Sequence, residues 1–449
     1  VGKKIHSGRS RNDQVLWLRN HPSIIAWFVG SDVMPRPELE RRYKACLDEI
    51  DDRPYITAAK EMTSEISGPS GTKMAGPYEY VAPNYWYASE APGGAFGFNT
   101  ETGIGAQLPV IESIRKMIPE DKLWPLNDVW NYHCTASTTA MNNLDVLTEN
   151  ITARYGEAKD LNDYLRKADL LNYEGTRAMF EAFRVNVPRT TGIVQWMLNS
   201  AWPSFYWQLY DHYLVPTAAY YSVKKANRTQ QLMYDYGKKA VFAVNEGVEP
   251  QHLKGKMAVY DLNGKLLAEE EKDLEVLPYE PVEAFKVPVL GDNAFLMLQL
   301  TDNQGKLLTD NFYCLSATDD VYDWAKSTWY QSPITKPADF TKLASMPQAE
   351  CKADAALKQE GDSTWVEVKL ENAPATVAFF TRLSLKDAQG ELITPVFWED
   401  NYLSLAPGET RMVKCSIPRS VRVSAPVILS VSGWNVAEKN LELGLQKMK

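Results

Sequence analysis

The 449-residue sequence predicts a multidomain protein in which parallel β/α units come first and two antiparallel β-sandwiches follow. Up to about residue 228, short apolar runs alternate with segments whose apolar residues recur at helical spacing. Beyond that point apolar and polar residues alternate, which is typical of half-buried strands. We therefore expect the architecture to change near residue 228.

The first part of the chain contains five expected strands, at 24–30, 53–59, 78–87, 94–99 and 191–202. Three segments between and after them have helical character: 38–50, the long stretch 107–187 with its clearest helix at 161–186, and the amphipathic run 213–227. Apolar strands that alternate with helices indicate parallel β/α units.

The second part of the chain repeats one turn pattern three times: DLNGKL at 261–266, DNQGKL at 302–307 and DAQGEL at 387–392. Each copy lies between alternating apolar runs, and its glycine tolerates the positive φ that a tight hairpin turn requires. The sequence therefore predicts one β-sandwich at 229–330 and a second at 331–449, after a first domain at 16–228.

Composition excludes several functions. The net charge of −9 argues against a nucleic-acid partner, and no apolar run is long enough for a membrane-spanning helix. Five cysteines lie far apart without CxxC spacing, so neither a disulfide framework nor a zinc site is indicated. Aromatic residues make up 11% of the chain and form clusters, which suits stacking on sugar rings but also suits a large aromatic core.

Two carboxylates follow expected strands of the first domain. Asp32 comes after IIAWFVGS, and Glu101 comes after GAFGFNT. In β/α barrels the functional residues lie at the carboxyl ends of the strands, and a pair of carboxylates is the minimum equipment for glycosidic-bond hydrolysis. A structural alternative stays open for both: Asp32 as a loop acid or a cap for the helix at 38–50, and Glu101 as a polar strand end.

Several segments resemble glycoside hydrolases of family 2. They are HPSIIAW with its strand-end acid, FNTETG, QWMLNSAWPS and YDHYLVPTAAYYSVKKA, while DNYLSLAPGET resembles the last domain of the β-mannosidases in that family. The GSD form at 30–32, GPSGTKMAGPYEYVAPNYWY and GGAFGFNTET are similar to the exo-β-D-glucosaminidase branch. For residues 16–449 the resemblance implies the C-terminal part of a (β/α)8 TIM barrel, about strands 4–8, followed by two immunoglobulin-like β-sandwich domains.

The resemblance also implies roles for single residues. Asp32 would be the general acid/base and Glu101 the nucleophile of a retaining mechanism, with Trp196 as the aromatic floor of the sugar site. Other implied substrate-binding residues are Tyr85, Trp86, Asn199 and Trp202. The chemistry requires a carbohydrate substrate but neither a metal nor a cofactor, and the family implies a periplasmic or secreted location.

The function expected from the resemblance is release of D-glucosamine from the ends of chitosan or its oligosaccharides. A β-mannosidase-like specificity and a non-catalytic carbohydrate-binding module are the alternatives. We expect an incomplete and inactive fragment, because barrel strands one to three are absent if the strand at 24–30 is the fourth. Residues 2–15 instead resemble the substrate-binding loop of argininosuccinate lyases, and we expect the piece at 1–15 to have no function.

Overall fold

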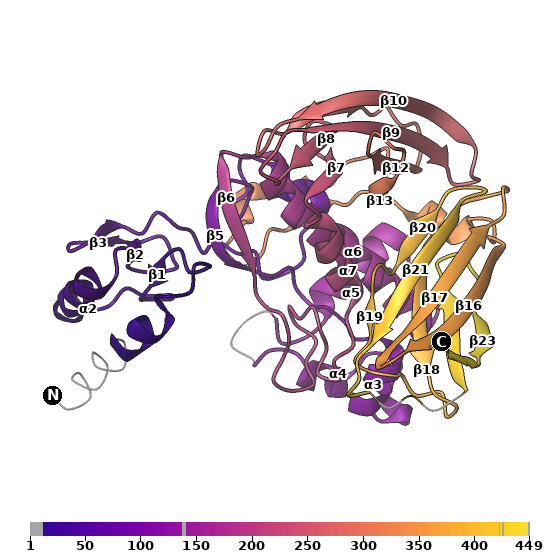
Figure 1. The fold of residues 1–449 in the computed structure, drawn as a ribbon, viewed down its shortest axis with the longest axis horizontal. Coiled ribbons are helices and arrows are strands. Elements are labelled where there is room, and N and C mark those ends of the chain that lie inside the picture. The colour runs from indigo at the N-terminus through magenta and orange to yellow at the C-terminus, as the bar shows by residue number, and fades with distance from the viewer. Residues whose placement is uncertain (1–11, 137–140, 422, 424–425, 448–449) are drawn as a thin grey trace.

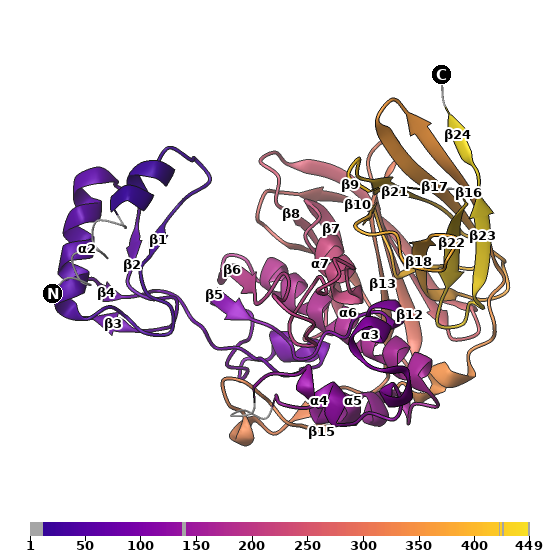
Figure 2. The same cartoon turned by 90° about the horizontal axis from the view of Figure 1, so that it is seen from below.

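A computed structural model describes residues 12–136, 141–421, 423 and 426–447. A β/α part is followed by two β-sandwiches, and a small N-terminal lobe that carries α2 projects from the rest of the molecule (Figures 1 and 2). Residues 1–11 lie outside the described residues, and so most of the expected lyase-like piece at 1–15 is not described. No described helix has the length and apolar character needed to cross a membrane.

The β/α part holds two pairs of parallel strands. In the lobe, β1 (Trp27–Phe28) pairs with β2 (Tyr55–Ile56), and α2 (Pro37–Ile50) connects them. The lobe also carries the short hairpin of β3 (Thr63–Ser64) and β4 (Gly68–Pro69). Nearer the body of the molecule, β5 (Gly97–Thr102) pairs with β6 (Thr190–Gln195).

A layer of helices lies between β5 and β6 in the sequence and continues after β6. Its members are α3 (Ile111–Met117), η2 (Glu120–Lys122), α4 (Asp128–Tyr132), α5 (Asp145–Tyr155), α6 (Leu161–Val185) and α7 (Ala218–Ala226). The long helix α6 packs against α7, α5 and the first sandwich, so it forms the central support of the molecule (Figure 1).

Helix α6 is buried on nearly all sides from Asp163 onward. It begins at the cap residue Asp160, whose carboxylate accepts a hydrogen bond from the backbone N–H of Asp163 at 2.9 Å. Its buried charges are paired within the helix, because Arg177 Nη2 lies 2.6 Å from Glu174 Oε2. Pairing reduces the large cost of burying a charge.

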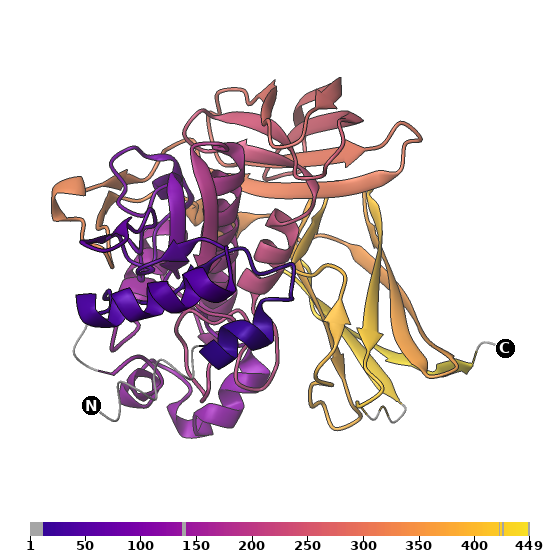
Figure 3. The ribbon, with the colours of Figure 1, turned by 60° about the vertical axis from the view of Figure 1, so that its left-hand side comes forward.

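The first sandwich consists of a four-stranded sheet in the order β10-β9-β12-β13 and a three-stranded sheet in the order β11-β8-β7. Both sheets are antiparallel, and the long strands arch over the helices (Figure 3). The strands are β7 (Gln230–Asp235), β8 (Ala240–Asn245), β9 (Gln251–Asp261), β10 (Leu266–Val276), β11 (Val282–Lys286), β12 (Ala294–Thr301) and β13 (Leu307–Leu315).

The second sandwich packs a five-stranded sheet, β19-β21-β17-β16-β24, against a four-stranded sheet, β20-β18-β22-β23. Its strands are β16 (Cys351–Glu360), β17 (Ser363–Asn372), β18 (Ala378–Lys386), β19 (Phe397–Trp398), β20 (Leu403–Leu405), β21 (Thr410–Ile417), β22 (Val427–Ser432), β23 (Lys439–Leu443) and β24 (Leu445–Lys447). The segment between the sandwiches holds β14 (Val321–Tyr322), η3 (Trp324–Lys326), β15 (Ile334–Lys336) and η4 (Thr341–Ser345).

Two expectations for single elements are wrong. Residues 78–87 form no strand: they are extended backbone that ends in the 3-10 helix η1 (Pro83–Tyr87), and the proline at its start supplies a helical φ. A parallel bridge between Lys73 and Asn99 occupies the expected place beside β5. The turn at 387–392 closes only a single bridge, because β18 pairs with β20 and β22 instead.

Candidate active site around Glu101

Glu101 is the penultimate residue of β5, and its side chain is about half buried. The strand is held on one side by β6 and on the other by Lys73, whose N–H donates to the carbonyl of Phe98 and whose carbonyl accepts from Thr100 N, both at 2.9 Å. Glu101 is therefore carried by backbone that is hydrogen-bonded along both edges. A side chain on such an element is positioned more precisely than one on a loop.

Tyr78 contacts the carboxylate directly. Its hydroxyl donates a 2.7 Å hydrogen bond to Glu101 Oε1. The backbone around Tyr78 is fixed as well: its carbonyl accepts from Trp207 Nε1 at 2.8 Å, and its N–H donates to the carbonyl of Tyr330 at 2.9 Å. One oxygen of Glu101 is thus oriented by a group with little freedom to move.

The electrostatic surroundings of Glu101 connect it with Asp32. Burial raises the pKa of the Glu101 carboxyl, the hydrogen bond from Tyr78 opposes this rise, and the negative charge of Asp32 raises the pKa further. The pKa of Tyr78 is also raised, first by burial and then by its contact with Glu101. The two acids proposed from the sequence therefore lie close enough for the charge of one to act on the other.

Asp32 is on an exposed bend four residues after β1. The backbone just before the bend is tied to the segment that follows β2, since the carbonyl of Gly30 accepts from Ala59 N at 3.0 Å. The same region contacts β5, because Thr100 Oγ1 donates to the carbonyl of Ala59 at 2.9 Å. Asp32 thus follows one parallel strand and Glu101 lies near the end of another, as the sequence predicts. Asp32 is exposed to solvent, whereas Glu101 is half buried.

Trp196 follows β6 next to the same strand end. Its N–H donates to the carbonyl of Thr102 at 2.7 Å, and the residue is 43% exposed, so part of it is accessible to a ligand. Gly103 faces the Trp196 carbonyl so closely that a Cβ there would lie 2.0 Å from the oxygen. Glycine is therefore required beside Glu101 for the two strand ends to approach one another.

Asn199 and Trp202 lie further along the segment after β6. Asn199 is exposed and forms an isolated bridge with Tyr210. Trp202 is 41% exposed and stacks on the ring of His133 with centroids 5.8 Å apart. Among the described residues the structure gives neither of them a contact with Glu101, so their part in substrate binding stays a prediction.

The expectation that Tyr85 and Trp86 line the sugar site is wrong in this structure. Both side chains have no exposed surface. They belong to η1, where the two rings pack edge to face at 5.2 Å and the Tyr85 hydroxyl accepts from Gly93 N at 3.0 Å. Their aromatic surface is used in the core, which is the more common use of clustered aromatic residues.

Three further residues belong to this site without any signal in the sequence: Tyr78, Trp207 and Trp329. Trp329 is 58% exposed, and its ring meets that of Tyr78 edge to face at 5.4 Å. Tyr78 lies 23 residues from Glu101 and Trp329 comes from the segment between the sandwiches. No periodicity links positions so far apart, so only their meeting in space reveals them.

No group of three or more His, Cys, Asp or Glu that could hold a metal ion occurs among the described residues. None of the five cysteines, all of which lie in the described part of the chain, forms a disulfide. The groups around Glu101 are therefore carboxylate, phenol and indole, a set that can transfer a proton, attack an electrophilic carbon and stack on a sugar ring.

Two family models match the sandwiches. Residues 237–318 match the mannosidase Ig/CBM-like domain, and residues 329–436 match the exo-β-D-glucosaminidase Ig-fold domain. The two β-sandwiches are immunoglobulin-like domains.

Similarity to known proteins extends over nearly the whole chain. It is 36% identical over 439 residues to an exo-β-D-glucosaminidase of Arthroderma benhamiae, an alignment that covers 94% of this chain and 49% of that protein. An exo-β-D-glucosaminidase of Streptomyces avermitilis is 34% identical over 445 residues, with the same coverage. The chain is homologous to the exo-β-D-glucosaminidases of glycoside hydrolase family 2. It spans about half the length of these curated relatives.

Solved structures agree with this relationship. The exo-chitosanase of Amycolatopsis orientalis, in complex with PNP-β-D-glucosamine, superimposes with a TM-score of 0.91 at 33% identity, covering 97% of this chain and 53% of that one. A β-D-mannosidase of Dictyoglomus thermophilum shares the fold with a TM-score of 0.72 at 19% identity. All of these relatives are named as glycosidases. Those named for glucosamine or chitosan are 33–36% identical to this chain, whereas the mannosidase is 19% identical.

Proposed function

We propose that these residues form part of a retaining glycosidase site that acts on β-linked amino sugars at chitosan or chito-oligosaccharide ends and releases D-glucosamine. The observation that carries the proposal is the half-buried Glu101, oriented by Tyr78 and influenced by the charge of Asp32. Exo-β-D-glucosaminidase relatives at 34–36% identity over 94% of the chain support the substrate class.

In the proposed mechanism Glu101 attacks the anomeric carbon while Asp32 protonates the departing oxygen, and Asp32 then deprotonates the water that releases the sugar. Glu101 must be ionised for the first step, and the hydrogen bond from Tyr78 favours that form. Trp196 would stack on the sugar that is bound at the end of β6. No cofactor enters any of these steps.

The architecture that we propose for residues 16–228 is the part of a TIM barrel from about strand 4 to strand 8. The parallel pairs β1–β2 and β5–β6 and the parallel bridge of Lys73 with Asn99 support it. We further propose that the two immunoglobulin-like domains occupy 229–330 and 331–449. The family matches at 237–318 and 329–436 favour a division near residue 330.

We expect little turnover from the 449-residue chain alone. Within the described residues β1 and β6 each pair along one edge only. Large apolar side chains beside them are exposed, Val33 by 69% and Leu198 by 58%. An open face admits water to charges whose catalytic strength depends on excluding it.

The test is release of D-glucosamine from chitotriose by the whole chain, with the Amycolatopsis orientalis enzyme run in parallel. Any release should fall at least about a thousandfold in Glu101→Gln and by about a hundredfold or more in Asp32→Asn. The exposed acid Glu90 provides the matched control, since Glu90→Gln should leave the rate unchanged. Release that persists in Glu101→Gln would contradict the proposal.

A non-catalytic carbohydrate-binding module is the second candidate, because Asp32 is exposed and the apolar face is open. Retention of the chain on chitosan beads without release of sugar would favour it. Release of mannose from a β-mannoside at a higher rate than glucosamine from chitotriose would instead favour the β-mannosidase specificity suggested by the mannosidase relatives.

A further inference from the structure

The segment between the sandwiches carries an exposed tryptophan beside the candidate active site. Trp329 is 58% exposed, although tryptophan is a residue whose large apolar surface gains much from burial. The other tryptophan of this segment, Trp324, is partly buried and packs against the core rings of Tyr85 and Tyr322. The core therefore uses Trp324 and leaves more than half of Trp329 in contact with solvent.

Trp329 belongs to a turn that hydrogen bonds close at its base. Thr328 N donates to the carbonyl of Gln331 at 2.8 Å, and Gln331 N donates to Thr328 Oγ1 at 3.2 Å. Trp329 and Tyr330 form the tip between these two residues, and their rings meet edge to face with centroids 5.4 Å apart. The bonds across the base restrict the backbone positions open to Trp329.

The turn is attached to the backbone around Tyr78. The carbonyl of Tyr330 accepts hydrogen bonds from the N–H groups of Tyr78 and Glu79, both at 2.9 Å. The carbonyl of Trp329 packs against Gly76, where a Cβ would lie 2.0 Å from the oxygen. A side chain at position 76 would force the turn away, so glycine is required there for this close approach. Backbone contacts thus hold Trp329 in place.

The side chain of Tyr78 connects Trp329 with Glu101. Its hydroxyl donates to Glu101 Oε1 at 2.7 Å, and its ring meets that of Trp329 edge to face with centroids 5.4 Å apart. Trp329 is therefore one side chain removed from the carboxylate proposed as nucleophile. Because a nucleophile has to lie about 3–3.5 Å from the carbon that it attacks, the sugar under attack lies against Glu101, and a ring on Trp329 belongs to the next position outward.

An exposed indole is suited to the apolar C–H face of a pyranose. It offers a wide flat apolar surface, and its N–H can donate to a hydroxyl group. A sugar at the end of an oligosaccharide always has a neighbour through the bond to be broken. A site that removes the end sugar must therefore accommodate a second ring beside the first.

We propose that Trp329 binds the second sugar of a chito-oligosaccharide, next to the terminal sugar at Glu101, and so gives the site a preference for oligosaccharides over D-glucosamine. The contact is stacking of the indole on the C–H face of the ring. The inference rests on the proposed glycosidase site, because it takes the first sugar to lie at Glu101. It does not require turnover by this chain.

The test is isothermal titration of the whole chain carrying Glu101→Gln, which prevents covalent attack, with D-glucosamine and with chitotriose. Chitotriose should bind saturably, and Trp329→Ala should weaken its binding about tenfold, the loss expected when one aromatic stacking contact is removed. D-glucosamine, which occupies only the first position, should bind equally to both chains. Trp329→Phe keeps an aromatic ring and should retain most of the affinity for chitotriose.

Two controls distinguish a substrate contact from a structural role. Trp365→Ala, on β17 of the second sandwich, removes another tryptophan and should leave the affinity for chitotriose unchanged. In chains with Glu101 intact, ¹³C-detected titration should give the same Glu101 pKa with and without Trp329→Ala, because the backbone bonds that hold Tyr78 are kept.

Three outcomes would each overturn the inference: no saturable binding of chitotriose, equal chitotriose affinities in Trp329→Ala and its parent chain, or an equal loss of affinity for both ligands. Failure of the proposed function would look different. Chitotriose binding that depends on Trp329, without release of D-glucosamine, would contradict only the glycosidase activity. Release of D-glucosamine from chitotriose at the same rate and KM in Trp329→Ala would contradict only the role of Trp329.

Discussion

At the scale of single residues, the hydrogen bond from Tyr78 to Glu101 is the contact on which the proposed chemistry most depends. It opposes the burial and the nearby charge of Asp32, both of which favour the protonated form of Glu101. A nucleophilic carboxylate has to be ionised, so Tyr78 keeps Glu101 in the reactive state at lower pH than its surroundings alone would allow.

Tyr78→Phe should therefore raise the pKa of Glu101 further and shift the acidic limb of the pH–rate profile upward. A hydrogen bond to a charged group contributes about 1.5–3 kcal/mol, which corresponds to a pKa rise of about one to two units. The measurement is a ¹³C-detected titration of the Glu101 carboxyl in the whole chain. Tyr132→Phe, at an exposed tyrosine, is the matched control, and an unchanged Glu101 pKa in Tyr78→Phe would contradict the role.

Glu79, the neighbour of Tyr78, gives a prediction about stability. Burial raises its pKa to about 7, although Tyr206 Oη donates to it at 3.1 Å. Between about pH 4.5 and 7 the folded state then holds more protons at this position than the unfolded state, so the free energy of unfolding falls as pH rises.

Glu79→Gln should remove up to about 3 kcal/mol of this pH-dependent loss. Urea denaturation at a series of pH values measures it, as the difference in slope between the variant and the unsubstituted chain. Glu90→Gln, which changes an exposed acid, should leave the slope as it is. Identical slopes for Glu79→Gln and the unsubstituted chain would show that the pKa of Glu79 is the same in the folded and unfolded states.

At the scale of elements, helical periodicity was the most reliable signal. The helix predicted at 161–186 is α6 (Leu161–Val185), because a long run of apolar residues at helical spacing follows a good cap residue, Asp160. The strand predicted at 78–87 is wrong, since a run of aromatic residues suits a strand and a buried 3-10 helix equally well. Pro83 was the local sign that favoured the helix.

Asp160→Ala should lower the stability of the chain by about 1 kcal/mol, because it leaves the N–H of Asp163 at the start of α6 without its acceptor. Thermal or urea unfolding of the whole chain provides the measurement. Asn162→Ala, at an exposed position in the first turn of the same helix, should change stability much less. A loss of equal size in both variants would contradict the capping role.

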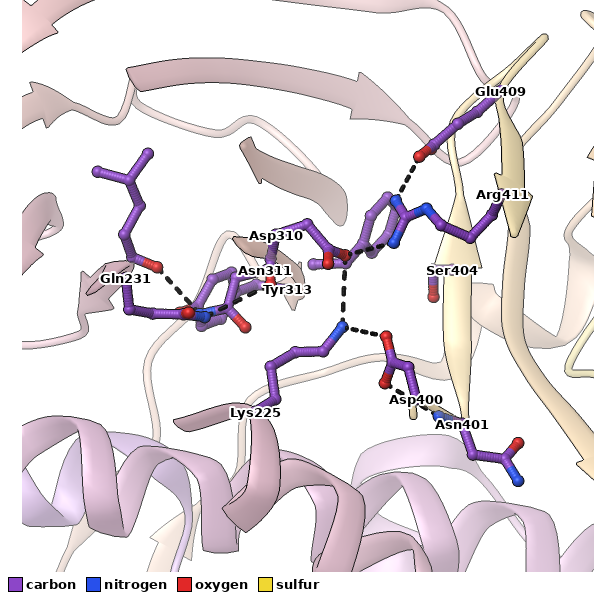
Figure 4. A network of polar contacts seen from close by, with 12 residues as sticks. Lys225, Gln231, Asp310, Asn311, Tyr313, Asp400, Asn401, Ser404, Glu409 and Arg411 are labelled. Atoms are coloured by element: carbon purple, nitrogen blue, oxygen red, sulfur yellow. Dashed lines mark hydrogen bonds and ion pairs between the residues drawn. The ribbon is translucent and has the colours of Figure 1, made fainter. Parts of the chain in front are cut away.

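At the scale of the whole molecule, a buried network of charges joins three parts of the structure (Figure 4). Lys225 of α7 lies 3.3 Å from Asp310 of β13 and 2.9 Å from Asp400 of the second sandwich. Arg411 of β21 pairs with Asp310 at 3.1 Å and with Glu409. The nearby cations hold the pKa of Asp310 below its usual range despite burial, so Asp310 is ionised at neutral pH when the chain is folded.

Lys225→Met should destabilise the chain by about 3–5 kcal/mol, since it removes the cation that Asp400 and the buried Asp310 share. Chemical denaturation followed by tryptophan fluorescence measures the loss. Lys265→Met removes an exposed lysine of a hairpin turn and serves as the control. A stability change below about 1 kcal/mol in Lys225→Met would show that solvent or other groups compensate these carboxylates.

The sequence by itself determined the order of architectures, the positions of most helices, two of the three repeated turns as hairpins, and the two acids at strand ends. These features depend on residues that are close together in the chain, where periodicity and turn chemistry act. Only the tertiary structure decided that Tyr78 orients Glu101, that Tyr85 and Trp86 are buried, and that Lys225 connects the domains. Those outcomes depend on which distant segments meet and how far each side chain is removed from water, and no local pattern carries that information.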